Sequence, residues 1–148
     1  MRAIITKIAE KHGLDLMADQ AHLKLTMESM MPLVIEKVDK WQVTVTHYYY
    51  QNGDACADPD MKFFMQANYS QAARLPDGTA SLNTTYDWVP LEITQVLGYR
   101  RCATLDDDQA KLVSYSARAM REIASFAAMW AMNIRDQHWL ERGVMVPD

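Results

Sequence analysis

Apolar and polar side chains alternate through much of the chain, with the two-residue period of half-buried β-strands. The clearest stretch is WQVTVTHYYY at residues 41–50, where alternate positions form a more apolar and a more polar set. The apolar set is expected to face the core: Trp41, Val43, Val45, His47 and Tyr49. The same period predicts further strands at residues 22–28, 33–38, 60–66, 81–88 and 91–96, with a continuation at 100–103.

A helical pattern opens the chain. Ile4, Ile5 and Ile8 have the spacing of one helix face. Gly13 is a typical helix stop, so a short helix is predicted at residues 2–11.

A second helical pattern begins at Asp106. Its apolar residues predict one amphipathic helix of roughly 30 residues, or two helices separated near Ser114. The acidic residues 106–108 suit the positive end of a helix dipole. We therefore expect residues 1–148 to form a single α+β domain. In it, an antiparallel sheet of five to six strands packs against a short N-terminal helix and a long C-terminal helix.

The bulk composition fits one folded chain and narrows the function classes. The 148 residues are 49% hydrophobic and 23% charged, close to the average for globular proteins. The formal charge of −4 argues against a nucleic-acid-binding protein that relies on phosphate neutralisation. No apolar run has the length of a membrane span or a signal peptide, and two cysteines are too few for a disulfide framework. We expect a cytoplasmic protein.

The stretch HYYYQNGDACADPDM at residues 47–61 is the strongest candidate for a binding site. Asp54, Asp58 and Asp60 supply three carboxylates that suit Mg²⁺, Mn²⁺ or Ca²⁺. His47 could add a further ligand or a general base. The spacing departs from an EF-hand loop, which has a central glycine and a closing glutamate.

The same stretch also has a purely structural interpretation. Asn52 and Gly53 are a strong turn signal, the aspartates that follow can cap backbone N–H groups, and Pro59 can set the entry to the next strand. The connection up to Pro59 is then a loop longer than a two-residue hairpin. In this interpretation His47 is a hydrogen-bonded residue of the core.

Tyr48 and Tyr50 belong to the polar set of their strand and are expected to point outward. With Phe64 on the next strand they predict an exposed aromatic patch for a nucleobase or a partner protein. The candidate binding residues of this region are Tyr48, Tyr50, Asn52, Asp54, Asp58 and Asp60.

Three stretches resemble a known family: HYYYQNGDACADPDM, the later DWVPLEITQVLGY and the carboxy-terminal SFAAMWAMNIRDQ. In order and spacing they are similar to a family of small bacterial and mobile-element proteins that is catalogued only as a domain of unknown function. The first motif, Tyr-x-Gln-Asn-Gly-Asp-x3-Asp-Pro-x-Met, is the most specific of the three. The resemblance supports the α+β fold and implies no catalytic residue, because no activity is established for the family.

These observations favour a non-enzymatic binding or regulatory protein of the cytoplasm that acts through protein contacts and without a cofactor. Met120, Met129 and Met132 on the long helix could pack against a second copy, so a homodimer is expected. The alternative is a metal-dependent hydrolase of a phosphorylated or nucleotide substrate that uses the region of His47, Asp54, Asp58 and Asp60. A third hypothesis, an acidic mimic of nucleic acid, requires the carboxylates to cluster on one face.

Overall fold

The computed structural model describes the backbone of residues 1–74 and 76–147, and the side chains of all of these except 71–74 and 80–82. The helices in this part of the chain are α1 (Arg2–Lys11), α2 (Ala117–Asp136) and α3 (Trp139–Arg142). Among them, none is long and apolar enough to span a lipid bilayer. The strands are β1 (His22–Thr26), β2 (Leu33–Asp39), β3 (Gln42–Gln51), β4 (Asp54–Arg74), β5 (Ala80–Gln95), β6 (Gly98–Arg101), β7 (Ala103–Leu105), β8 (Leu112–Tyr115) and β9 (Val144–Met145).

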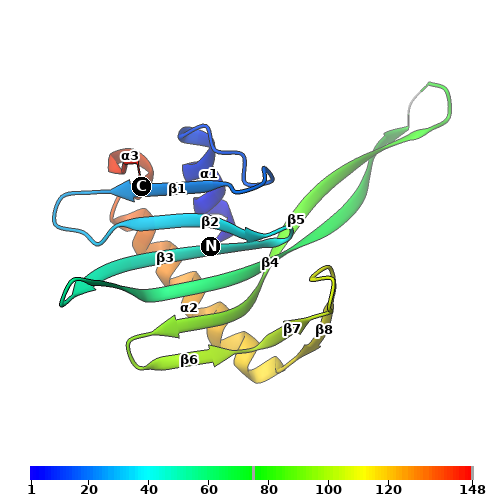
Figure 1. Cartoon of the computed structure of the whole chain (residues 1–148). Coiled ribbons are helices and arrows are strands. Elements are labelled where there is room, and N and C mark those ends of the chain that lie inside the picture. The colour runs from blue at the N-terminus through cyan, green and yellow to red at the C-terminus, as the bar shows by residue number, and fades with distance from the viewer. Residues whose placement is uncertain (75, 148) are drawn as a thin grey trace.

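Seven strands form one antiparallel sheet, in the order β6-β5-β4-β3-β2-β1-β9. From β1 to β6 each strand lies beside its successor in sequence, whereas β9 returns from the end of the chain to pair with β1. The short β7 and β8 form a separate pair that follows the end of β6 (Figure 1). The helices pack against one face of the large sheet and leave its other face open (Figure 1). We call these the helix-covered face and the open face.

The core lies between the large sheet and the helices, because alternate residues of the central strands point toward the helices. One register row of buried apolar side chains crosses five strands: Leu23, Ile35, Val45, Met61 and Ile93. The helices bury their own apolar residues against it, chiefly Ile5, Ile8, Ile123, Trp130 and Ile134. The alternation within WQVTVTHYYY therefore predicted the core face of β3 correctly.

The α+β class, the first helix and the long C-terminal helix are confirmed, but the large sheet has seven strands rather than five or six. The two-residue β9 adds an edge strand that no local pattern predicts. Residues 81–95 form part of one strand instead of two, because β5 continues through Pro90, and Val96 lies in the turn that follows. The expected irregularity is there: Leu91 is an extra residue between the pairs Phe63–Pro90 and Lys62–Glu92.

The predicted start of the C-terminal helix at Asp106 is wrong, because α2 begins at Ala117. The carboxylate of Asp106 instead accepts backbone hydrogen bonds from Ala110 at 2.7 Å and Lys111 at 3.0 Å, which closes a turn. The next residues form β8, which pairs with β7. Ser116 then caps α2 by accepting a hydrogen bond from the backbone N–H of Ala119.

β4 and β5 continue beyond the sheet as a two-stranded ribbon. β3 pairs with β4 only as far as Phe64, and β6 pairs with β5 only from Glu92 onward. From the pair Gln66–Asp87 to the pair Arg74–Ala80, the two strands pair with no other described strand, and only their base, at Tyr86 and Asp87, is also hydrogen-bonded to Arg2. Residues 66–74 and 80–87 are called the ribbon below. It projects away from the body of the molecule (Figure 1).

Candidate functional site

The predicted loop after His47 is a tight β-hairpin. Asn52 and Gly53 alone connect β3 to β4, and both have positive φ angles, 54° and 91°. A type I′ turn requires such angles at both positions, and asparagine and glycine tolerate them best. The prediction of a longer loop up to Pro59 is therefore wrong, because residues 54–57 already pair with β3.

A bulge in β4 directs the candidate residues toward different faces of the sheet. Asp58 and Pro59 both lie opposite His47, so β4 has one residue more than β3 at this point, and the Asp58–Pro59 peptide is cis. An extra residue changes the face that the rest of the strand presents. As a result Asp58 lies on the helix-covered side, whereas Asp60 lies on the open face beside Thr46.

His47 lies in the core. Its ring centroid is 5.5 Å from those of both Trp130 and Trp139, and the residue is 7% exposed. Nδ1 donates a hydrogen bond to the carbonyl oxygen of Pro32 at 3.1 Å, which leaves Nε2 as the acceptor nitrogen. Burial lowers the pKa of His47, and the carbonyls of Pro32 and Met31 only partly oppose this effect. The imidazole is therefore neutral at pH 7.

His47 and Asp58 line the same cavity, which has a volume of about 320 Å³. Its walls come from α2 and α3, from the connection between β1 and β2, and from the bulge of β4. One carboxylate oxygen of Asp58 accepts a hydrogen bond from the backbone N–H of Val96 at 3.3 Å. The structure thus brings together two of the candidate residues in one hollow of the surface.

The other candidate residues lie elsewhere. Tyr48 and Asp60 are on the open face, and Tyr50, Asn52 and Asp54 are exposed at the tip of the hairpin. In the described part of the chain, no three His, Cys, Asp or Glu side chains meet as the ligands of a metal ion would. The geometry therefore does not support the hydrolase hypothesis, which required these side chains to converge.

The predicted aromatic patch does not form. Tyr50 is 65% exposed, but Phe64 is only 4% exposed. Phe64 shares its face with its cross-strand partner Gln42, whose side-chain amide donates to Gln109 in the β7–β8 connection at 2.9 Å. That connection covers this end of the open face, so Phe64 is buried although the alternation assigned its direction correctly.

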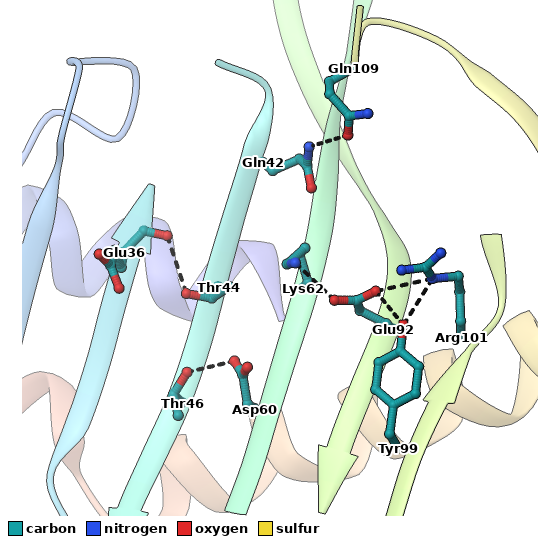
Figure 2. Close-up of polar contacts among 10 residues, drawn as sticks. All are labelled: Glu36, Gln42, Thr44, Thr46, Asp60, Lys62, Glu92, Tyr99, Arg101 and Gln109. Carbon is teal, nitrogen blue, oxygen red and sulfur yellow. Dashed lines mark hydrogen bonds and ion pairs between the residues drawn. The ribbon is translucent and has the colours of Figure 1, made fainter. Parts of the chain in front are cut away.

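Polar side chains lie in register across the open face (Figure 2). One row crosses six strands: His22, Glu36, Thr44, Lys62, Glu92 and Arg101. The next row holds Lys24, Val34, Thr46, Asp60, Thr94 and Tyr99. Thr46 donates to Asp60 at 2.7 Å and is only 2% exposed.

Glu92 is at the centre of this polar network (Figure 2). Its carboxylate lies 2.8 Å from Nζ of Lys62, accepts a hydrogen bond from the hydroxyl of Tyr99 at 2.7 Å, and lies 3.3 Å from Nε of Arg101. Burial alone would raise the pKa of Glu92, but the bonds from Lys62 and Tyr99 outweigh it and hold this pKa below its ordinary value. Glu92 is therefore ionised and links three neighbouring strands.

Asp60, on the same face, behaves in the opposite way. Burial raises its pKa, although the hydrogen bond from Thr46 and the charge of Lys62 oppose this effect. Carboxylates with pKa values shifted apart are typical of acid–base sites. Here, however, both oxygens of Glu92 already have partners, and the cavity beside it has only about 190 Å³. We conclude that this network stabilises the pairing of the strands.

A family model described as a domain of unknown function (DUF6908) matches residues 3–140. The chain belongs to this family. No curated protein and no solved structure matches the chain. The DUF6908 match includes α1 and the first strands as well as the three stretches that resemble the family, at residues 47–61, 87–99 and 125–137.

Two features of this DUF6908 chain, the polar network and the cavity, were not predicted from the sequence. Each member of the polar network, such as Thr44 or Glu92, is in sequence an ordinary outward residue of a strand, and only the register places it beside its partners. The cavity joins β4 to α2, which supplies Phe126 and Trp130 from a distant part of the chain. Polar residues at alternate positions of adjacent strands were the one local signal for the network.

Proposed function

We propose that this protein acts in the cytoplasm by binding another protein chain, without catalysis, and that the ribbon makes the contact. The observation that supports this is that the ribbon strands pair with no other described strand. Beyond the base, where Arg2 donates to the carbonyl oxygen of Tyr86, each strand therefore presents a backbone edge without a neighbouring strand, and such edges readily accept a further strand from another chain.

The composition of the ribbon fits such a contact. Exposed edges are usually protected by charged residues or proline. The described side chains at 66–70 and 83–86 are uncharged, and Tyr69 is 70% exposed. Asp87, at the base of the ribbon, is paired with Arg2 at 3.4 Å and accepts a hydrogen bond from Asn68. Exposed tyrosine with few charges is typical of interface cores.

A partner would also stabilise the ribbon. A two-stranded hairpin without further support is only marginally stable in water. A strand added from a partner chain would supply hydrogen bonds to one of the free edges. Binding of a partner strand would therefore favour the fully folded ribbon.

A second copy of this chain is the expected partner. Edge-to-edge pairing of two identical ribbons is self-complementary, as a two-fold dimer requires. Met132 on α2 is 53% exposed and offers a further apolar surface for a second copy. Both cysteines are free thiols, which fits the reducing cytoplasm.

The proposal is tested by shortening the ribbon. In one variant, residues 69–84 are replaced by Asn-Gly, so that the paired residues Asn68 and Thr85 are joined by a type I′ turn. A second variant, Ser70→Lys with Asn83→Glu, keeps the ribbon but adds opposite charges at a directly paired position. Sedimentation velocity should show a dimer of the unaltered protein, and both variants should sediment as monomers.

Two results would contradict the proposal. One is a shortened variant that still dimerises as tightly as the unaltered protein, which would place the contact elsewhere. The other is an unaltered protein that stays monomeric and whose purified ribbon variants retain the same host proteins in a pull-down. A heterologous partner would be indicated if the unaltered protein is monomeric and both variants lose one host protein.

A further inference from the structure

Several aromatic side chains line the cavity that holds His47 and Asp58. The ring centroids of Phe126 and Trp130 lie 6.4 Å apart at an interplanar angle of 42°, and Trp130 and Trp139 each lie 5.5 Å from the ring of His47. Phe126 is partly exposed and Trp130 is 5% exposed, whereas Trp139 is fully buried, so a ligand would contact chiefly the first two rings. The electron-rich faces of such rings attract positively charged groups.

A single carboxylate lines the same cavity. Of the described residues that line the cavity, Asp58 alone carries a formal charge at neutral pH; the other polar groups are carboxamides and the imidazole. The backbone N–H of Val96 donates to one oxygen of Asp58, and no described cation lies within 4.0 Å of this carboxylate. Asp58 therefore has capacity for a positively charged partner.

The rim of the cavity is apolar and adaptable. Met30, Met31 and Met129 are each partly exposed there, and methionine side chains adjust easily to the shape of a ligand. The volume of about 320 Å³ is near the lower end of the range for small-molecule sites. A ligand of a few heavy atoms with an apolar part fits these conditions.

We propose that this cavity binds a small organic cation, an alkylated ammonium group carried on a short chain. The ammonium would lie against Trp130 and Phe126 beside the carboxylate of Asp58, and its alkyl groups would contact the methionine rim. This site is independent of the ribbon, which projects from the opposite end of the sheet (Figure 1). Two residues of the stretch at 47–61, His47 and Asp58, belong to this site.

The test compares choline with its neutral isostere, 3,3-dimethylbutan-1-ol. Binding is followed by the indole N–H signals in ¹⁵N-resolved NMR spectra, since Trp130 and Trp139 line the cavity whereas Trp41 and Trp88 do not. Choline should shift the two cavity signals saturably and leave the other two in place. The neutral isostere should bind about tenfold more weakly, because it lacks the attraction to the rings and to Asp58.

Two variants that remove one negative charge test whether Asp58 acts at the cavity or only through the net charge of the protein. Asp58→Asn keeps an acceptor for the N–H of Val96 and should weaken choline binding about tenfold without changing that of the isostere. Asp54→Asn makes the same change in net charge at the exposed tip of the hairpin, and choline binding should not change. Phe126→Leu, which keeps the lining apolar, should weaken choline binding more than isostere binding.

Three results would overturn the proposal: no saturable shift with choline, equal affinity for choline and the isostere, or equal weakening by Asp54→Asn and Asp58→Asn. Thermal unfolding of each variant establishes that it is folded before titration. If Asp58→Asn does not fold, Phe126→Leu decides the question alone, since it tests the aromatic contribution without altering the bulge.

Discussion

Burial governs the ionisation of single residues on both faces of the sheet. It lowers the pKa of His47 on the helix-covered side and raises the pKa of Asp60 on the open face, so each is pushed toward its neutral form. Glu92 is the exception, because Lys62 and Tyr99 bond to its charged form. The cost of removing a charge from water thus explains the pKa shifts of His47 and Asp60, whereas direct hydrogen-bond partners explain that of Glu92.

Acid should destabilise the fold through His47. Because its pKa is lowered in the folded state, the unfolded chain binds a proton first, near the ordinary value of about 6.5. This contribution to the free energy of unfolding is therefore complete above about pH 6.5 and is lost as the pH falls toward the folded pKa. Urea unfolding at several pH values should show the decrease, and His47→Gln should lack that part of it. Equal pH dependence of the two proteins would contradict the prediction.

At the scale of elements, the end of the chain is fixed where α3 meets β9. Gly143 lies between them, and its backbone N–H donates to the carbonyl oxygen of Trp139 at 3.0 Å. A Cβ atom on Gly143 would lie 2.7 Å from that same oxygen and 3.2 Å from Cδ1 of Leu25. β9 then pairs with β1 through Leu25 and Met145. The small size of Gly143 is what lets the last helix lie against the edge of the sheet.

Gly143→Ala should therefore destabilise the protein by about 1–3 kcal/mol, because the added methyl group must displace α3 or Leu25. The neighbouring exposed Arg142 provides the control, and Arg142→Ala should change the free energy of unfolding by no more than about 0.5 kcal/mol. Urea unfolding of both variants measures the difference. Similar stabilities for the two would show that the junction can relax without cost.

At the scale of the whole molecule, the body and the ribbon have different sources of stability. The body is held by a core between sheet and helices, with the polar network on its open face. The ribbon is held by the pairing of its own two strands. The contacts that join them lie at its base, where Tyr86 stacks on Trp41 and Asp87 pairs with Arg2.

Shortening the ribbon should thus leave the body intact. The variant in which Asn-Gly replaces residues 69–84 retains the base contacts of Tyr86 and Asp87. The free energy of unfolding of the monomer should change by no more than about 1 kcal/mol, since a loop of different length alters closure entropy only slightly. Urea unfolding at low protein concentration measures this change. A loss of several kcal/mol would show that the ribbon contributes to the core.

The sequence predicted elements where burial follows a local period, as in β3 and α1. It failed at residues 106–116, where the bonds of Asp106 to the backbone and the pairing of β8 with β7 override the helical spacing. Among the candidate residues, His47 and Asp58 were brought together only by the bulge and by packing against α2. Contacts of this kind depend on register between distant segments, which a single sequence does not reveal.

The bulge at Asp58 and Pro59 also has an evolutionary consequence. Asp58 and Pro59 together lie opposite His47, so Ala57 and Asp60 both lie on the open face although they are three positions apart. Loss of one of these two residues would leave a regular ladder, in which Ala57 still pairs with Tyr48 and Asp60 still pairs with Thr46. The sheet should therefore accept such a deletion, whereas the cavity would lose part of its lining. An extra residue that is kept at this position among relatives would indicate selection on the cavity rather than on the pairing of the strands.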